Sequence, residues 1–420
     1  MKILLVPAAY FPALGGTERT TRVIAESLAR RGHSVAIAVA DISSFAGYYD
    51  LASPRTGRPQ RETLDGVDIY RIELYSRLVS QQAKLIRRFQ TPPRSGELAM
   101  KVLKYVSRSG FKRRLGALVR WLKPDVILTL PHLQPHVKMA AEIALSERIY
   151  LGIFPHIHAN DPSFPHRDLA KVCRSADLCI AITEQERRRL VEDYGVPLAK
   201  ALYSGLGTVL PEAGEGGARG STPTDVLFVG RKTATKGLAV LAEAVKGMAR
   251  RGGFRVVLIG ARAPDTEALE AAFRAELGEG QFVSEHDVSD DELDRWYRQS
   301  RLVVLPSRIE SFGSVILEAW ARGRPIVTLD LPIFREIVSA GIDGLLVPPD
   351  DAGALSKAIS DLLDDEAEAD RMGRAGREKV AQNYTWPSVV DRIEGCLLTG
   401  LDSRARAAGE GLSQGTTAQR

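Results

Sequence analysis

Two glutamates flank a short polar run in the segment Arg308–Arg322, RIESFGSVILEAWAR. Glu310 lies just before a predicted helix, and Glu318 lies about two turns further along. The backbone amides between them would stand at the positive end of the helix, and Gly313 lets a ligand approach the backbone closely. The segment therefore predicts an anion-binding site. The alternative is that Glu310 and Ser311 only cap the helix and Glu318 is solvated.

A pair of cations follows a different predicted strand. Arg231 and Lys236 lie in FVGRKTATKG, directly after Val226–Val229. Arginine binds two oxygens of a diphosphate side by side, and lysine supplies a point charge. A lysine at a helix N-terminus is unfavourable unless an anion is bound there. The pair therefore favours a diphosphate ligand over an ordinary solvated loop.

Strands and helices alternate along the chain and would position these residues. Short apolar runs such as Lys2–Val6 and Val126–Leu130 are typical of strands buried on both faces, and Thr17–Arg31 has helical periodicity. The pattern restarts at Val226–Val229, after the glycine-rich segment Pro211–Thr224. The sequence thus predicts an α/β protein with two Rossmann-like, doubly wound parallel-sheet domains facing a cleft.

A chain of 420 residues exceeds the usual size of one hydrophobic core, which favours two domains. Residues 1–210 are predicted to form the N-terminal domain, 211–224 a linker and 225–385 the C-terminal domain. A helix over 386–400 would follow and cross back to the first domain. Residues 401–420 lack apolar periodicity and are predicted to be a disordered tail.

Composition narrows the class of protein. The cysteines Cys173, Cys179 and Cys396 are too few for a disulfide framework and lack metal-ligand spacing, which favours a cytoplasmic location. No apolar run reaches the ~18 residues of a membrane-spanning helix. The apolar run at the N-terminus is interrupted early by prolines and glycines, unlike a signal peptide.

Together these motifs resemble the retaining GT-B glycosyltransferases of the family 4 type, which carry a Glu-x7-Glu motif. The likeness covers nearly the whole chain except Arg77–Gly116, the linker and the tail. The matching segments are Glu310–Glu318 with the following Ala319–Pro325, FVGR with Lys236-Gly237, Gly344–Pro349 and Tyr384–Trp386. The resemblance implies a GT-B fold and transfer of a hexose from a nucleoside diphosphate sugar, with retained configuration and without a cofactor.

The resemblance also implies roles for single residues. Arg231 and Lys236 would neutralise the leaving diphosphate. Glu318 would bind the ribose hydroxyls, and Glu310 would bind a hydroxyl of the donor sugar. Backbone groups complete the expected donor site: the amides around Phe312, Gly313 and Ser314 would hold sugar and phosphate oxygens, and Gly15 and Gly16 in LGGTER would approach the distal phosphate.

Histidines follow two predicted strands. His156 in GIFPHIHAND ends Tyr150–Phe154, where this family places an active-site histidine near the donor sugar. His158 is the weaker candidate, and with His132 and His136 it would line the acceptor side. Thr183 and Glu186 have the spacing of a helix capping box, and no chemistry is assigned to them.

Two segments depart from the family pattern. Ser204–Gly207, SGLG, stands where Asn-Gly-x-Asp is usual, which affects the hinge between the domains. Leu331–Glu336, LPIFRE, lacks the usual glycines before its glutamate, which is expected to affect the donor pocket.

Some features of the sequence also occur in other classes of protein. Asp41 ends the second strand, where dehydrogenases bind ribose, but the first loop lacks Gly-x-Gly-x-x-Gly. A nucleotide-sugar epimerase or hydrolase, a sugar phosphorylase and a non-catalytic sugar-binding protein share the fold. A phosphorylase would need a pyridoxal-binding lysine, and no motif indicates one.

The acceptor is left open as a glycan, a lipid-linked molecule or a small molecule. Between Arg71 and Lys123 there are fourteen Lys or Arg residues and two acids, with apolar residues interleaved. This pattern is typical of helices on anionic membrane surfaces. The alternative is a solvated insertion whose apolar residues pack on the first domain. Nucleic acid is not an expected partner, and no metal is expected, because no Asp-x-Asp follows a strand near the cleft.

Overall fold

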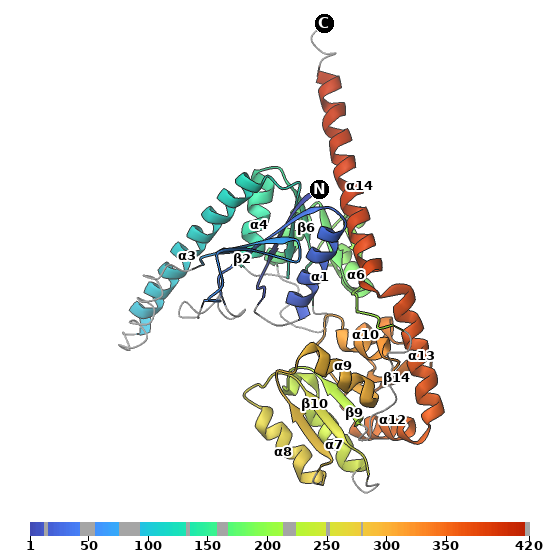
Figure 1. The fold of residues 1–420 in the computed structure, drawn as a ribbon. Coiled ribbons are helices and arrows are strands. Elements are labelled where there is room, and N and C mark those ends of the chain that lie inside the picture. Colours follow the sequence, from blue (N-terminus) through green and yellow to red (C-terminus); the bar gives the residue numbers. More distant parts are fainter. Residues whose placement is uncertain are drawn as a thin grey trace.

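The computed structural model describes residues 1–11, 16–42, 55–74, 93–131, 135–157, 167–212, 224–248, 253–278 and 280–415. They form two α/β domains, each built on one sheet (Figure 1). The first sheet has the order β3-β4-β2-β1-β5-β6-β7-β8 and is parallel except where β3 meets β4. Its strands are β1 (Lys2–Pro7), β2 (Ser34–Ala40), β3 (Arg61–Leu64), β4 (Val67–Ile72), β5 (Val126–Leu130), β6 (Tyr150–Ile153), β7 (Leu178–Ala181) and β8 (Ala201–Tyr203).

Helices cover both faces of this sheet, because its strands are apolar on both sides. In β1, Ile3 and Leu5 join a core with α1 (Gly16–Arg30) and the start of α14 (Trp386–Gly415). Leu4 and Val6 join the opposite core, which contains residues of the remaining helices. Those helices are α3 (Pro93–Leu122), α4 (Pro135–Ser146), α5 (Arg167–Ser175) and α6 (Glu184–Glu192).

The second sheet is wholly parallel, with the order β11-β10-β9-β12-β13-β14. Its strands are β9 (Thr224–Val229), β10 (Val256–Ile259), β11 (Phe282–Glu285), β12 (Ser300–Leu305), β13 (Ile326–Leu329) and β14 (Gly344–Val347). Its helices are α7 (Leu238–Met248), α8 (Thr266–Glu276), α9 (Asp290–Gln299), α10 (Ser314–Ala321), α11 (Pro332–Ile337), α12 (Ala352–Asp364) and α13 (Glu366–Asn383).

The strand order explains why distant motifs meet. Strands β9 and β12 are neighbours although they are far apart in sequence, so the order reverses between them. Ligands of open parallel sheets bind at such a switch point, beyond the carboxyl ends of the strands. Arg231 and Lys236 follow β9, and Glu310 follows β12, so the fold brings both predicted groups to one crevice.

The chain passes between the domains twice at one place. Thr208 pairs with Thr385, and Gly207 packs against the ring of Trp386. Helix α14 then runs back along the first domain, where Arg31 and His33 both contact Glu394, at 2.5 and 2.6 Å. The unusual Ser204–Gly207 segment therefore lies where the outgoing and returning chains touch.

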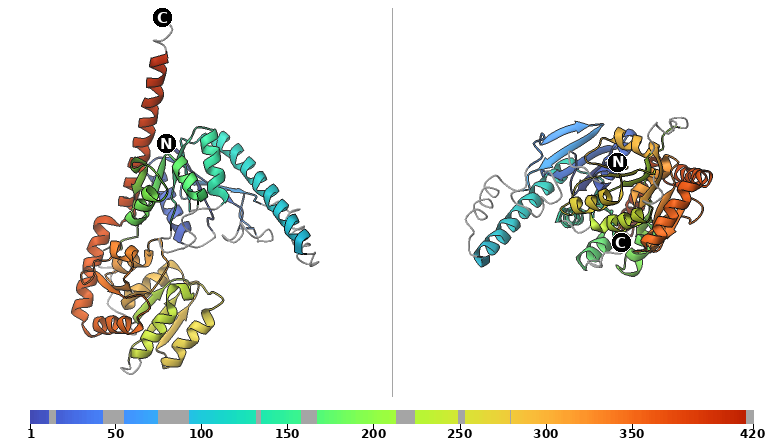
Figure 2. Two further views of the ribbon diagram at one scale, coloured as in Figure 1. Left: turned by 180° about the vertical axis from the view of Figure 1, so that it is seen from behind. Right: turned by 90° about the horizontal axis from the view of Figure 1, so that it is seen from below.

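The predicted disordered tail is wrong for residues 401–415, because α14 continues to Gly415. The helix projects beyond the first domain in Figures 1 and 2. Leu401 packs against the core, and Arg404 donates to the Arg148 carbonyl oxygen at 3.0 Å and pairs with Asp177 at 3.4 Å. These contacts stabilise a segment whose own apolar pattern is weak. Residues 416–420 lie outside the described part of the chain.

Candidate functional site

A cleft of about 570 Å³ lies between the domains and receives residues from both. Gly16 and His156 come from the first domain, and the other predicted residues in its lining come from the second. The predicted residues that line it are Gly16, His156, Arg231, Lys236, Glu310, Phe312, Gly313, Ser314 and Glu318. Gly15, His132 and His158, which the sequence also nominates, lie outside the described residues.

The loop after β9 is held tightly against the end of β12. It ends in a 3₁₀ turn over Ala234–Lys236, followed by Gly237 at φ +76°. A Cβ on Gly237 would collide with the carbonyl of Pro306, so only glycine fits between the two segments. Arg231 is exposed at the cleft, and Lys236 is fixed one residue before this close contact.

Lys236 and Glu310 form an ion pair across the switch point. The Lys236 Nζ lies 2.7 Å from Glu310 Oε1, and the two side chains are 18% and 14% exposed. Partial burial strengthens such a pair compared with one on the open surface. Lys236 is the cation expected to face a diphosphate, and Glu310 is the carboxylate expected to face a sugar. The two side chains therefore contact each other before any ligand binds.

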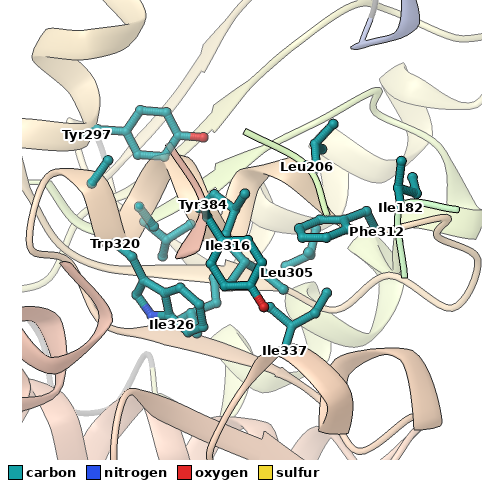
Figure 3. Packing of buried hydrophobic residues seen from close by; sticks show 14 of the residues in the cluster. Ile182, Leu206, Tyr297, Leu305, Phe312, Ile316, Trp320, Ile326, Ile337 and Tyr384 are labelled. Carbon is teal, nitrogen blue, oxygen red and sulfur yellow. The ribbon is translucent and has the colours of Figure 1, made fainter. Parts of the chain in front are cut away.

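Helix α10 begins directly at the cleft. Its N-cap is Gly313 at φ +88°, in the left-handed region, and the Ile316 amide donates to the Gly313 carbonyl oxygen at 2.9 Å. The amides of Ser314 and Val315 before it belong to the first turn, where a helix offers no carbonyl partner of its own. The Phe312 side chain is 2% exposed and packs edge-on against Tyr384, with ring centroids 6.0 Å apart (Figure 3). Phe312 can therefore offer a ligand its backbone but not its ring.

Glu318 is held by Tyr297, a residue that no motif in the sequence marks. The Tyr297 hydroxyl donates to Glu318 Oε2 at 2.8 Å, and burial raises the Tyr297 pKa well above its usual value. Tyr297 is buried beside α10 (Figure 3). The other oxygen, Oε1, lies 3.7 Å from Nη1 of Arg19, which comes from α1 of the first domain. Arg19 stands at the end of the LGGTER motif, three residues after Gly16.

The first domain supplies a histidine and a carboxylate to the cleft. His156 follows β6 with φ +50°, and its side chain packs edge-on against Phe154. Glu18, in the first turn of α1, also lines the cleft, and burial raises its pKa. No local feature of the sequence distinguishes Glu18, because only the position of α1 places it opposite the second domain.

His136 does not line the acceptor side, contrary to expectation. It is fully buried in α4, where its Nε2 donates to the Leu130 carbonyl oxygen at 2.7 Å. The ring thus satisfies a backbone group at the end of β5. Position after a strand alone did not distinguish this structural role from a functional one.

The segment Leu331–Glu336, which departs from the family pattern, does not lie where the sequence predicted. Leu331–Glu336 enters helix α11, and none of these six described residues lines the cleft. Instead Glu336 accepts hydrogen bonds from the amides of Glu184 and Gln185 in the first domain, the latter at 2.9 Å. The segment therefore joins the domains.

Two facing parallel-sheet domains, with cations, carboxylates and a helix N-terminus at the switch point of one sheet, define a protein of the GT-B class. The description "Glycosyl transferase 4-like domain" matches residues 15–207, and "Glycosyl transferases group 1" matches residues 211–379. The chain belongs to the glycosyltransferase family that these two descriptions cover. Among the described residues, no helix is both long and apolar enough to span a membrane.

Individual relatives show how broad this family is. D-inositol 3-phosphate glycosyltransferase 1 of Catenulispora acidiphila is 32% identical over 254 residues, 56% of this chain and 60% of that protein. Glycogen synthase of Mycobacterium tuberculosis is 26% identical, over 93% of this chain and 92% of its own. Alr3699/HepE of Anabaena, solved with UDP-glucose, has a TM-score of 0.70 at 16% identity, covering 95% of this chain and 100% of its own. That likeness shows the fold. The chain spans about 60% of the length of the first relative.

Proposed function

We propose that the chain is a retaining, metal-independent glycosyltransferase that moves a hexose from a nucleoside diphosphate sugar to a hydroxyl of an acceptor. The observation that carries the proposal is the Lys236–Glu310 pair at 2.7 Å, placed in the same cleft as Arg231 and Glu318. A nucleoside diphosphate sugar needs this combination, because it presents phosphate charge beside ribose and sugar hydroxyls.

The expected chemistry follows from where charge develops. Cleavage of the sugar–phosphate bond leaves an additional negative charge on the diphosphate, and fixed cations stabilise it. Arg231, Lys236 and the N-terminus of α10 supply that positive charge, which is why no metal ion is required in this proposal. Glu310 would hold a sugar hydroxyl, and Glu318 the ribose. His156 would face the sugar from the first domain.

The names of relatives support a nucleotide-sugar donor. The Anabaena protein was solved with UDP-glucose, and two curated relatives are named for glycosyl transfer to inositol 3-phosphate and for glycogen synthesis. These acceptors differ in kind, so the acceptor of this chain is proposed only as a glycan, a lipid-linked molecule or a small molecule. Retention rests on the family resemblance.

One assay tests donor use, stereochemistry and metal independence together. The protein is incubated with UDP-, GDP- and ADP-linked hexoses in excess chelator, and nucleoside diphosphate release and the sugar's anomeric proton are followed by NMR. We expect release from one donor class and a first-formed sugar with the donor's configuration. Inversion would contradict retention, and activity restored only by magnesium or manganese would contradict metal independence. No release from any donor would reject the proposed function, and an epimerised nucleotide sugar would favour an epimerase.

The basic segment Arg71–Lys123 supports a further part of the proposal, a surface that binds anionic lipid. Helix α3 leaves the first domain at its N-terminal end in Figures 1 and 2. Its C-terminal half packs inward through Phe111 and Leu115, and Lys112 pairs with Glu142 at 2.6 Å. The C-terminal half of α3 therefore packs on the first domain, as the alternative interpretation of this segment expected. Lipid contact is proposed only for the projecting part of α3 and for the exposed basic residues beside it.

Vesicle co-sedimentation measures this contact. The protein is expected to bind anionic vesicles at low salt, to bind neutral vesicles poorly, and to be released by high salt. Each basic residue near such a surface contributes about 1 kcal/mol, so Lys104→Glu in the projecting part with Arg113→Glu, an exposed residue beside it, should lower the partition coefficient at least about thirtyfold. Arg295→Glu on α9 is the control for charge. Equal, negligible binding to both vesicle types would favour a soluble acceptor.

A further inference from the structure

The first turn of helix α6 is held from two directions. Thr183 caps it by accepting from the Glu186 amide at 3.0 Å, and Glu336 of the second domain accepts from the amides of Glu184 and Gln185. The four N-terminal amides of a helix lack intrahelical partners, and here the cap and the opposite domain satisfy them. The turn therefore has a fixed place at the domain interface.

Glu186 reaches from this turn into the interior instead of closing a capping box. Its Oε1 accepts from the Ile157 amide at 2.7 Å, and its Oε2 accepts from the Ile182 amide at 2.8 Å. The side chain is buried, and within the described part of the chain no cation lies at hydrogen-bond distance from it. Burial raises the pKa of the Glu186 carboxyl to about 7, although hydrogen bonds from the surrounding backbone oppose the rise. A buried carboxylate is costly, so its two backbone contacts indicate a specific task.

The loop that Glu186 holds is the one that carries His156. His156 has φ +50°, a conformation uncommon for residues other than glycine, and it persists only where the surroundings fix it. The hydrogen bond to Ile157 fixes the peptide that directly follows His156. The same carboxylate fixes the end of β7 through Ile182, so it ties the histidine loop to the sheet.

We infer that Glu186 is a positioning residue for His156, and that it sets the orientation in which the imidazole faces the donor sugar. The inference rests on the proposed function, because it takes His156 to act in sugar transfer. Because the same turn contacts Glu336, the position of His156 is also fixed relative to the second domain, which carries the donor site.

The variant Glu186→Gln tests the inference with little change in shape. The amide keeps one acceptor oxygen and replaces the other with a donor, so one backbone amide loses its partner. We expect kcat for nucleoside diphosphate release to fall about tenfold, since small misplacements of catalytic groups have such effects, while the donor KM stays within about twofold. Glu184→Gln is the matched control, because that side chain pairs with Arg187 on the same helix and should leave both constants unchanged.

A double-mutant cycle with His156→Ala separates positioning from general damage. If Glu186 acts through His156, Glu186→Gln should lower kcat by less than about twofold in the His156→Ala background, because interacting residues are not additive. The same tenfold loss in both backgrounds, or a loss no greater than that of Glu184→Gln, would overturn the inference.

Folding and the proposed function are checked in the same experiment. The wild type must release nucleoside diphosphate, and its failure to do so would reject the proposed function itself. If Glu186→Gln does not fold, judged by circular dichroism, Glu186→Asp takes its place, because it keeps the charge but is too short to reach both amides. The double-mutant cycle with Glu186→Asp has the same expected outcome. An equal loss of kcat in the wild-type and His156→Ala backgrounds would again overturn the inference.

Discussion

Lys236→Ala is expected to lower kcat/KM for the donor by about 10²- to 10³-fold, the usual effect of losing one preorganised group that stabilises developing charge. The loss has two causes. The leaving diphosphate loses a cation, and Glu310, now without its partner at 2.7 Å, places an uncompensated carboxylate in the cleft. The constants are measured by nucleoside diphosphate release under steady-state conditions.

Two further variants serve as controls for Lys236→Ala. Lys246→Ala removes a lysine from α7 whose side chain is 56% exposed, and it should leave kcat/KM unchanged. Lys236→Arg should recover only part of the activity, because a guanidinium has a different shape from an ammonium group. Activity of Lys236→Ala within about threefold of the wild type would contradict the assignment of Lys236 to the diphosphate.

Glu310→Gln should lower kcat by about 10²-fold, because a hydrogen bond to a charged group contributes about 1.5–3 kcal/mol and the change also releases Lys236. The substitution keeps the shape of the side chain, so the thermal midpoint should stay close to that of the wild type. The loss should appear in kcat at saturating donor, since Glu310 is assigned to the sugar that reacts.

Glu318→Gln is the informative comparison for Glu310. Glu318 is fixed by Tyr297 and is assigned to the ribose, which does not react, so its loss should raise the donor KM and change kcat little. If the two variants had the same pattern of kcat and KM, the separate roles of the two glutamates would be wrong.

Local features of the sequence were sufficient for the class of fold and for the motif loops. Runs such as Val126–Leu130 have the continuous apolar character of strands buried on both faces, and β5 occupies those residues. Arg231, Lys236 and Glu310 were found because each lies in the loop that follows a strand. Turn chemistry and short apolar runs are local properties, so they can be read without knowledge of the fold.

Contacts between segments that are distant in the sequence could not be predicted from these local features. His136 was misjudged, because its partner is a backbone carbonyl at the end of β5 and not a ligand. Residues 401–415 were assigned to a disordered tail, because Leu401 and Arg404 become stabilising only when α14 lies against the first domain. Glu186 was assigned a cap, whereas its carboxylate turns inward to the Ile157 amide.

By itself, the sequence determined that two parallel-sheet domains would form and which loops would carry cations and carboxylates, because both follow from periodicity and local chemistry. Only the tertiary structure decided which of these groups meet. Lys236 and Glu310 are 74 positions apart, and Gln185 and Glu336 are 151 apart. The first pair meets because β9 lies next to β12, and the second because α6 lies against α11 at the domain interface, and no local pattern encodes either contact.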